Sequence, residues 1–301
     1  MVLKGRGLFS HGVSERFTTF LSNIRLTDAQ KADGATKRES VCSALNWKYY
    51  SSTSGTNNSF YVGSWGKLTR IRPPRDVDVL FKLPNSVYER FQGKTGNKQS
   101  QLLQEVKNVL VSSFPKTDIR GDGPVVLVPF QSYAVELLPA FVLNSGQYWI
   151  PITASGGSYK TFDPDAEIKH INNSNGKTNN NTLDLVRMLK CWQAHCSVPL
   201  KSFYLELLAV KFLDQWEHAG KSKTYYDWMA RDFFAWLVNQ AWGTLYVPGT
   251  WESLSLRDAW KSKAQSAYER AAKATQNEAD NLPYTAGEDW QKIFGTDIPL
   301  T

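Results

Sequence analysis

The amino-acid sequence predicts an α+β protein, with a mixed-sheet lobe first and a helical lobe second. Short apolar runs rich in β-branched residues around positions 76–81 and 125–141 predict strands in the first half of the chain. Beyond about position 183, apolar residues recur at helical spacing through most of the sequence. A length of 301 residues also indicates two domains, at a prior of about 150 residues each. We expect these domains at 1–171 and 172–301, with the active site in a cleft between them.

The first half begins with predicted helices. An amphipathic helix is indicated by four apolar residues that share one helical face: Phe17, Phe20, Leu21 and Ile24. Helical sequence continues from about 28 to 50. The polar stretch 51–59, which contains glycine and asparagine, predicts a loop before the first acidic strand. A further helix is expected at 100–113, between the two strands that carry acidic residues.

The second half is predicted to be a helical bundle that follows a linker. The asparagine-rich run 172–181 predicts the linker. Helical periodicity then predicts four helices that would pack together, at 183–195, 203–219, 225–242 and 259–281. The aromatic stripe of the third helix is expected to be core rather than a platform on which bases stack.

Asp76 and Asp78 are the first candidate metal ligands. Successive side chains of a strand point to opposite faces, so both carboxylates would project together while Val77 and Val79 face the core. Two carboxylates so close repel each other unless a cation lies between them, and oxygen-rich clusters select hard divalent cations such as Mg²⁺. An isolated Asp-x-Asp pair also fits the solvated face of a strand. The glycine-serine turn that precedes the pair favours the metal site.

A third acid, Glu136, lies within an apolar strand predicted at 132–141. It alternates with Val135 and Leu137 and therefore faces away from them. A buried carboxylate is costly unless it is paired, hydrogen-bonded or bound to a metal. The alternative is a glutamate on the solvated side of an edge strand. We favour the metal ligand, because two partner acids are already in place.

A phosphate-binding turn is predicted just before the first acidic strand. Gly63 permits close approach of the backbone, and Ser64 offers a hydroxyl and an N–H to a phosphate oxygen. Four basic residues follow within a short stretch: Lys67, Arg70, Arg72 and Arg75. An anion-binding turn beside a metal-binding strand indicates nucleotidyl transfer.

These motifs resemble the catalytic core of the bacterial cGAS/DncV-like nucleotidyltransferases (CD-NTases), which make the signals of CBASS antiphage systems. The resemblance extends from about position 60 to the end of the sequence. In the first half it rests on Gly63-Ser64, Asp76-x-Asp78 and the run Val135–Ala140. In the second half it rests on four further segments: 161–164 with Asn172-Asn173, 185–192, 201–208, and Trp290 with 293–295.

The resemblance implies a polymerase-beta-like catalytic lobe and a helical lobe that completes the nucleotide pocket. Asp76, Asp78 and Glu136 would be catalytic and bind two Mg²⁺ ions, for which Mn²⁺ can substitute. Many family members carry aspartate at the third acidic position, and the longer glutamate side chain can still reach a metal from a slightly more distant backbone. The nucleotide-binding residues would be Gly63, Ser64, Lys67, Lys190 and Ser202.

Residues of the second half have alternative interpretations. Lys190 fits an ordinary lysine that keeps its charge in water, and Ser202 fits an ordinary helix N-cap. For the nucleotide role, a lysine charge suits a phosphate, and a helix N-terminus favours an anion. The helix of Lys190 also carries Cys191, His195 and Cys196. Three neighbouring ligands on one helix cannot complete a zinc tetrahedron, so no zinc site is expected.

The implied reaction is in-line attack by a ribose hydroxyl on the α-phosphorus of a bound nucleoside triphosphate, ATP or GTP, with release of pyrophosphate. Two or more rounds would close a cyclic di- or trinucleotide second messenger, to which a downstream effector responds in antiphage defence. A linear oligonucleotide synthase, of the oligoadenylate or RNA-tailing type, would use the same acids. A catalytically silent nucleotide-binding module is disfavoured, because all three acids are present.

Composition fits a cytoplasmic enzyme with anionic ligands. The net charge is +7 and the pI is about 9.1, which favours anionic partners such as nucleotides. No aromatic-basic motif supports activation by nucleic acid. No apolar run approaches the roughly 20 residues of a membrane span. The segment 1–6 lacks the apolar stretch of a secretory signal, and three cysteines form no disulfide framework. The segment 298–301 lacks a final glycine, so conjugation through it is not expected.

Overall fold

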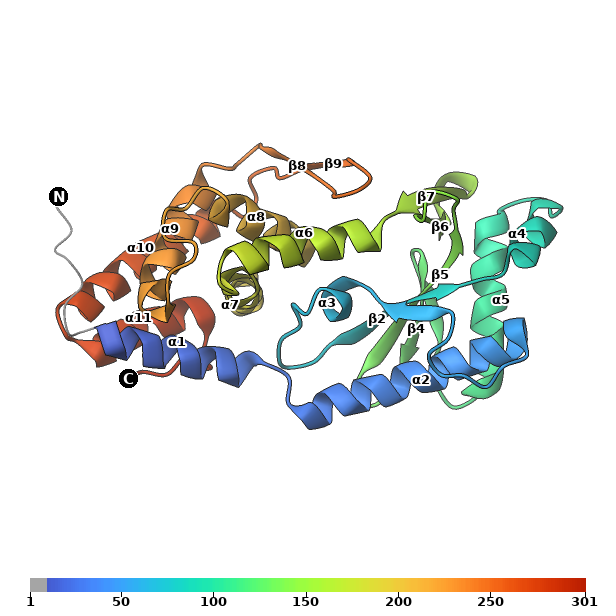
Figure 1. The fold of residues 1–301 in the computed structure, drawn as a ribbon, viewed down its shortest axis with the longest axis horizontal. Coiled ribbons are helices and arrows are strands. Elements are labelled where there is room, and N and C mark those ends of the chain that lie inside the picture. Colours follow the sequence, from blue (N-terminus) through green and yellow to red (C-terminus); the bar gives the residue numbers. More distant parts are fainter. Residues whose placement is uncertain (1–9) are drawn as a thin grey trace. The chain divides into compact units, whose positions relative to one another are not determined.

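The computed structural model describes residues 10–301 and confirms the α+β class (Figure 1). The chain forms two compact units. We call residues 26–168 with 248–250 the sheet unit, and the other described residues the helical unit. No helix among the described residues has both the length and the hydropathy that crossing a bilayer requires. The segment 1–6, for which no secretory signal was expected, lies outside the described residues.

The sheet unit is built on a mixed sheet with the strand order β1-β2-β5-β4-β3. β2 and β5 run parallel, whereas the other neighbours run antiparallel. β6 pairs with the end of β5, and β7 pairs with β6. The strands are β1 (Ser59–Tyr61), β2 (Asp76–Lys82), β3 (Arg120–Asp122), β4 (Val125–Pro129), β5 (Ala134–Val142), β6 (Tyr148–Ile152) and β7 (Ser158–Phe162). The strands predicted around the three acids are confirmed as β2, β4 and β5.

One face of this sheet carries the larger of two hydrophobic clusters in the unit. Alternate residues of β2 and β5 are fully buried there: Val77, Val79, Val135 and Leu137. They pack with apolar residues of α2 (Asp28–Tyr50) and α5 (Lys98–Ser113). Burial of apolar surface is the main favourable term in folding, so this face decides how the strands are oriented. The predicted alternation is confirmed, and it turns the acids to the opposite face.

The helices predicted in this unit are confirmed, with boundaries set by capping residues. Thr27 and Gln30 form a capping box at the start of α2, in which each side chain bonds the other residue's backbone N–H. Asn97 caps α5, which therefore begins two residues before the predicted start. α4 (Asn85–Gln92), β6 and β7 were not predicted. These elements are short, and β7 alternates only between exposed and half-buried residues.

The helical unit includes the first helix of the chain, α1 (Ser10–Ile24), which the expected boundary had assigned to the catalytic lobe. The ring of Phe17 lies 5.3 Å from that of Trp290, and the ring of Phe20 lies 5.1 Å from that of Phe294. The apolar face of α1 is therefore buried against the far end of the chain. The other helices are α6 (Pro164–Lys177), whose residues 164–168 belong to the sheet unit, α7 (Asn181–His195), α8 (Ser202–Leu213), α9 (Tyr226–Val238), α10 (Lys261–Ala279) and α11 (Pro283–Phe294).

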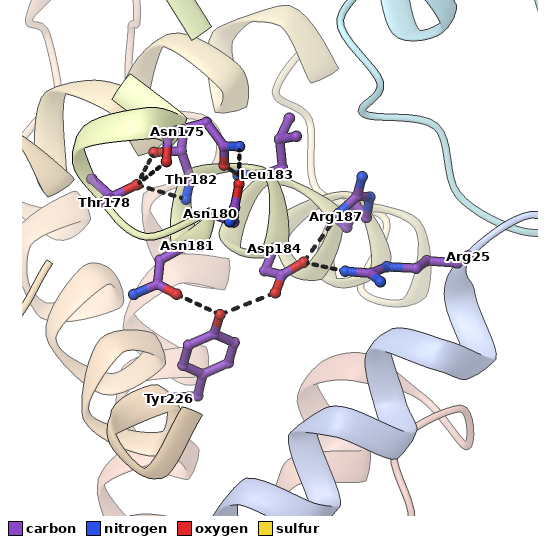
Figure 2. A network of polar contacts seen from close by, with 10 residues as sticks. All are labelled: Arg25, Asn175, Thr178, Asn180, Asn181, Thr182, Leu183, Asp184, Arg187 and Tyr226. Carbon is purple, nitrogen blue, oxygen red and sulfur yellow. Dashed lines mark hydrogen bonds and ion pairs between the residues drawn. The ribbon is translucent and has the colours of Figure 1, made fainter. Parts of the chain in front are cut away.

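The linker expected at 172–181 is wrong, because α6 and α7 occupy most of this segment. Several of its polar side chains bond one another and the backbone (Figure 2). The side chain of Asn175 accepts a hydrogen bond from the backbone N–H of Leu183 at 3.0 Å. The hydroxyls of Thr178 and Thr182 lie 2.8 Å apart. Asparagine content suggested a loop, but here these residues satisfy the ends of two helices.

The four helices predicted after this segment exist as α7, α8, α9 and α10. α8 ends at Leu213 and α9 at Val238, so both are shorter than predicted. After α9 the chain forms a short hairpin of β8 (Thr244–Tyr246) and β9 (Ser253–Ser255). The aromatic stripe of α9 is core, as predicted: Phe233 and Phe234 are fully buried.

Candidate active site

The structure brings the three predicted acids together. The parallel register of β2 and β5 places Asp78 opposite Glu136, and Asp76 lies two residues earlier on the same face of β2. One carboxylate oxygen from each residue lies within 4.8 Å of the other two. Strand alternation and the pairing of β2 with β5 therefore create a compact set of three carboxylates from two segments that are far apart in sequence.

The glycine-serine turn is the short helix α3 (Gly63–Gly66), and it packs directly on Asp78. The N–H and the hydroxyl of Ser64 both donate to Oδ2 of Asp78, at 3.0 and 3.1 Å. Gly63 has a φ of +51°, and a Cβ at this position would lie 2.5 Å from the same oxygen. Only glycine fits this approach, because it tolerates positive φ and has no side chain. The predicted proximity of turn and acids is confirmed.

Glu136 has an unusual electrostatic environment. β5 lies between β2 and β4, so the alternative of a glutamate on an edge strand is wrong. Burial, followed by the negative charges of Asp76, Asp78 and Asp122, raises the pKa of Glu136 from 4.5 to about 7. A cation among these carboxylates would lower that pKa again. Asp122, on β3, was not recognised from the sequence, because only the sheet pairing shows that it contributes to this field.

The donor set fits a hard divalent cation. It consists of carboxylate oxygens, the ligands that Mg²⁺ and Mn²⁺ prefer. Within the range 10–301, no lysine or arginine forms an ion pair with Asp76 or Glu136. A bound cation would therefore relieve the repulsion that raises the pKa of Glu136.

Lys67 is held in a buried ion pair. Its Nζ lies 3.0 Å from Oε2 of Glu167 on α6, and both side chains are at most 10% exposed. The charge of Lys67 is therefore already compensated within the sheet unit. Contact with a nucleotide would have to share this lysine with Glu167.

Lys190 and Ser202 belong to the helical unit. Lys190 is 8% exposed, and its Nζ lies 2.8 Å from Oε1 of Glu206 on α8, so it does not keep its charge in water. Ser202 opens α8 but makes no capping hydrogen bond; its hydroxyl donates to Oε1 of Gln193 at 2.7 Å. Neither of the ordinary alternatives for these two residues holds. Both contacts join α7 to α8: Lys190 and Gln193 lie on α7, and Glu206 and Ser202 lie on α8.

Comparison with a family model is consistent with this geometry. The model of the Second Messenger Oligonucleotide or Dinucleotide Synthetase domain matches residues 12–175, which is more than half of the chain. The probable cyclic nucleotide synthase of Bacillus cereus (strain VD146) is 22% identical over 274 residues. That alignment covers 79% of this chain and 81% of the relative.

Solved structures share the fold over almost the whole chain. The cyclic AMP-GMP synthase DncV of Vibrio cholerae, in complex with the linear intermediate 5′-pppA(3′,5′)pG, has a TM-score of 0.75 at 13% identity, with 97% of this chain and 96% of that chain covered. CdnC of E. coli MS115-1 with ATP has a TM-score of 0.67 at 17% identity, with 95% and 98% covered. The expected cGAS/DncV-like fold is confirmed. The chain therefore belongs to the family of second messenger oligonucleotide or dinucleotide synthetases, and it is a nucleotidyltransferase that makes oligonucleotide second messengers.

Proposed function

We propose that this enzyme joins nucleoside triphosphates, ATP or GTP, into a cyclic di- or trinucleotide and releases pyrophosphate. Asp76, Asp78 and Glu136 would hold two Mg²⁺ ions, for which Mn²⁺ can substitute. The observation that carries the proposal is the convergence of three carboxylates on one face of the sheet, directly beside the Gly63–Ser64 turn. Two solved neighbours support nucleotide substrates, because one holds ATP and the other a linear dinucleotide intermediate.

Residues around the three carboxylates would prepare them to bind the metal ions. When bound, the two ions would lower the pKa of the attacking ribose hydroxyl and neutralise the leaving pyrophosphate. Ser64 orients Asp78 by two hydrogen bonds to Oδ2 of that carboxylate. Glu136 must lose its proton before it can act as a ligand, because its pKa is raised to about 7. Loading of the site would therefore release a proton below neutral pH.

The triphosphate would be held by the residues that the resemblance indicated. Gly63 would offer its backbone to a phosphate beside the carboxylate of Asp78, which already lies close to it. In the helical unit, Lys190 and Ser202 are ordered by Glu206 and Gln193, respectively. A phosphate at Lys190 would share its ammonium group with Glu206, which already accepts from it.

Incubation of the purified protein with the four nucleoside triphosphates and Mg²⁺ or Mn²⁺ tests this proposal. Phosphatase-resistant products, identified by mass spectrometry, would show a cyclase. Phosphatase-sensitive ladders would show a linear synthase, and absence of pyrophosphate would contradict turnover. The Asp76→Ala, Asp78→Ala double variant should lose activity by about 10³-fold or more, because removal of the ligands removes the electrostatic stabilisation of the transition state. Unchanged turnover in this variant would contradict the metal site.

The proposed biological role is antiphage defence, in which the cyclic product activates a downstream effector. Phage plating on cells that carry the enzyme with its neighbouring genes tests this role. The wild type should reduce plaque numbers relative to the double variant at equal expression. Equal plating on both strains would contradict the defence role and leave the chemistry untouched.

A further inference from the structure

The carbonyl groups of the two acids on β2 are satisfied in different ways. The ladder between β1 and β2 ends at Val79, and the carbonyl of Asp78 then accepts from the backbone N–H of Val62 at 3.1 Å. The carbonyl of Asp76, two residues earlier, points to the same side of the strand but lies beyond the end of β1. It accepts from the indole Nε1 of Trp65 at 2.7 Å. A side-chain donor thus replaces the missing strand N–H at the first acid.

The indole ring of Trp65 is itself held in place. The ring of Tyr61 stacks on it with centroids 5.2 Å apart and an interplanar angle of 27°. The guanidinium of Arg70 lies 4.7 Å from the ring centre and also donates to the carbonyl of Trp65 at 3.2 Å. Arg38 of α2 in turn lies 4.3 Å from the ring centre of Tyr61. Two aromatic rings and two guanidinium groups thus form a continuous chain of contacts, which limits the movement of the indole.

Helix α2 leaves room for this ring at Gly34. A Cβ at Gly34 would lie 2.4 Å from Cη2 and 2.7 Å from Cζ2 of Trp65, and 3.3 Å from a methyl group of Val77. Glycine in the interior of a helix is destabilising relative to alanine. Its presence here is explained by the close approach of the indole to the helix.

One turn of the chain therefore orients both acids of β2. Ser64 bonds the carboxylate of Asp78, and the next residue, Trp65, bonds the carbonyl of Asp76. We propose that Trp65 is a positioning residue that sets the affinity of the carboxylate site for divalent metal, and that Gly34 and Arg70 act through it. This inference rests on the metal site proposed above. Trp65 is 5% exposed and would act through the backbone of Asp76, whose carbonyl accepts from its indole.

The first test is the Trp65→Phe variant, which keeps an aromatic ring and removes the Nε1 donor. Binding of Mn²⁺ alone, measured by the electron paramagnetic resonance signal of free Mn²⁺, should weaken about fivefold to tenfold, as expected for loss of one short hydrogen bond. At saturating metal, kcat should recover to within about threefold of the wild type, because no group that contacts substrate is removed.

Trp260→Phe is the matched control. Trp260 is 1% exposed, and its Nε1 donates to the carbonyl of Leu256 at 2.8 Å within the helical unit. This variant should lower the melting temperature, as Trp65→Phe does, without any change in the affinity for Mn²⁺. A Trp65→Phe variant that loses thermal stability but binds Mn²⁺ within twofold of the wild type would overturn the inference, since Trp65 would then be structural only.

Arg70→Lys keeps the inference testable if Trp65→Phe does not fold, and a cycle with Gly34→Ala adds a further test if it does. Arg70→Lys retains the charge but removes the planar group over the indole, and Mn²⁺ affinity should fall about twofold to threefold. Gly34→Ala pushes on the ring, and its effect on Mn²⁺ affinity should be larger alone than in the Trp65→Phe background, because phenylalanine lacks the atoms that the new methyl group meets. Wild-type affinity in Arg70→Lys, or additive effects in the Gly34 cycle, would overturn the inference.

The same measurements separate this inference from the proposed function. If Mn²⁺ binding to the wild type is unaffected by Asp76→Ala with Asp78→Ala, the proposed metal site is wrong and the inference falls with it. If those substitutions abolish binding but Trp65→Phe does not weaken it, the metal site stands and only the positioning role of Trp65 is overturned.

Discussion

The helical unit buries an acidic side chain and the sheet unit partly buries three, but the surroundings of the negative charge differ. In the helical unit, Asp184 of α7 is 5% exposed and accepts from three donors (Figure 2). These are Arg25 at 2.8 Å, Arg187 at 3.0 Å and the hydroxyl of Tyr226 at 3.0 Å. In the sheet unit, one carboxylate oxygen from each of Asp76, Asp78 and Glu136 lies within 4.8 Å of the other two, although Asp78 also accepts from Ser64.

The difference separates a structural carboxylate from a functional one. A buried charge that is fully hydrogen-bonded and paired holds elements together, and Asp184 connects the end of α1 with α7 and α9. Burial and the charge of Asp184 raise the pKa of Tyr226, so its hydroxyl remains a donor. Carboxylates that repel each other make no such contribution to folding. Their electrostatic cost is tolerated because a ligand can relieve it, as perturbed groups at functional sites commonly show.

Removal of Asp184 should give the largest loss of stability. Asp184→Ala removes one acceptor from Arg187, which is 13% exposed, and one from the buried hydroxyl of Tyr226, which retains Asn181. We expect the free energy of unfolding, measured in urea, to fall by about 3–5 kcal/mol. Asp28→Ala is the matched control, because Asp28 also lies in the first turn of a helix and pairs with a basic residue at i+3, but it is exposed. An equal effect of both substitutions would contradict the comparison.

Glu136→Gln should raise the free energy of unfolding at alkaline pH, whereas Asp184→Ala lowers it. Because the pKa of Glu136 is raised from 4.5 to about 7, the folded protein binds a proton that the unfolded chain releases between these pH values. Its contribution is therefore greatest at low pH and is lost as pH rises through about 7. In EDTA at pH 8, Glu136→Gln should be more stable than the wild type by about 1–2 kcal/mol, a figure reduced for the half-exposed carboxyl group.

The pH profile of that variant provides the control. Unfolding free energies measured from pH 4.5 to 8 should fall with rising pH more steeply in the wild type than in Glu136→Gln. Glu39→Gln, which changes an exposed glutamate of α2, should retain the wild-type slope. A slope that is identical in all three proteins would show that Glu136 carries no electrostatic cost.

Arg25→Gln should have the smallest effect. The side chain of Arg25 is 52% exposed, so its ion pair with Asp184 is screened by water. We expect urea unfolding to show a loss of about 0–1 kcal/mol. Arg187→Gln removes a partner of the same carboxylate oxygen from a mostly buried position and should cost more. Equal losses would indicate that exposure does not determine the value of these pairs.

Sequence patterns predicted which residues form the carboxylate cluster, because the strand face of each acid follows from local rules, whereas the pairing of β2 with β5 brings the acids together. Alternation along a strand was enough to place Asp76 and Asp78 on one face, and the apolar neighbours of Glu136 were enough to place it on a buried strand. The segment 172–181 was misassigned because composition cannot show that asparagine and threonine side chains bond across a helix junction. Asp184 was not singled out for the same reason, since its three partners lie on different helices.

The environment of the two lysines predicted to bind phosphate depends on residues that are distant in sequence. Lys67 and Lys190 were chosen as basic residues in family-like positions, and the structure places each in a buried ion pair, with Glu167 and Glu206. Neither glutamate is near its lysine in sequence. Trp65 was recognised only as part of a turn, although a glycine within the predicted helix 28–50 was a signal that something large approaches that helix at Gly34.

By itself, the sequence determined the α+β class, the burial pattern of β2 and β5, and the identity of the three acids, because backbone geometry enforces periods of 2 and 3.6 wherever a face is buried. Only the tertiary structure decided which charges are compensated and which are not. Charge compensation depends on side chains that meet from separate elements, as Arg25, Arg187 and Tyr226 do at Asp184. Such contacts depend on how the elements pack, and the local spacing of residues does not predict them.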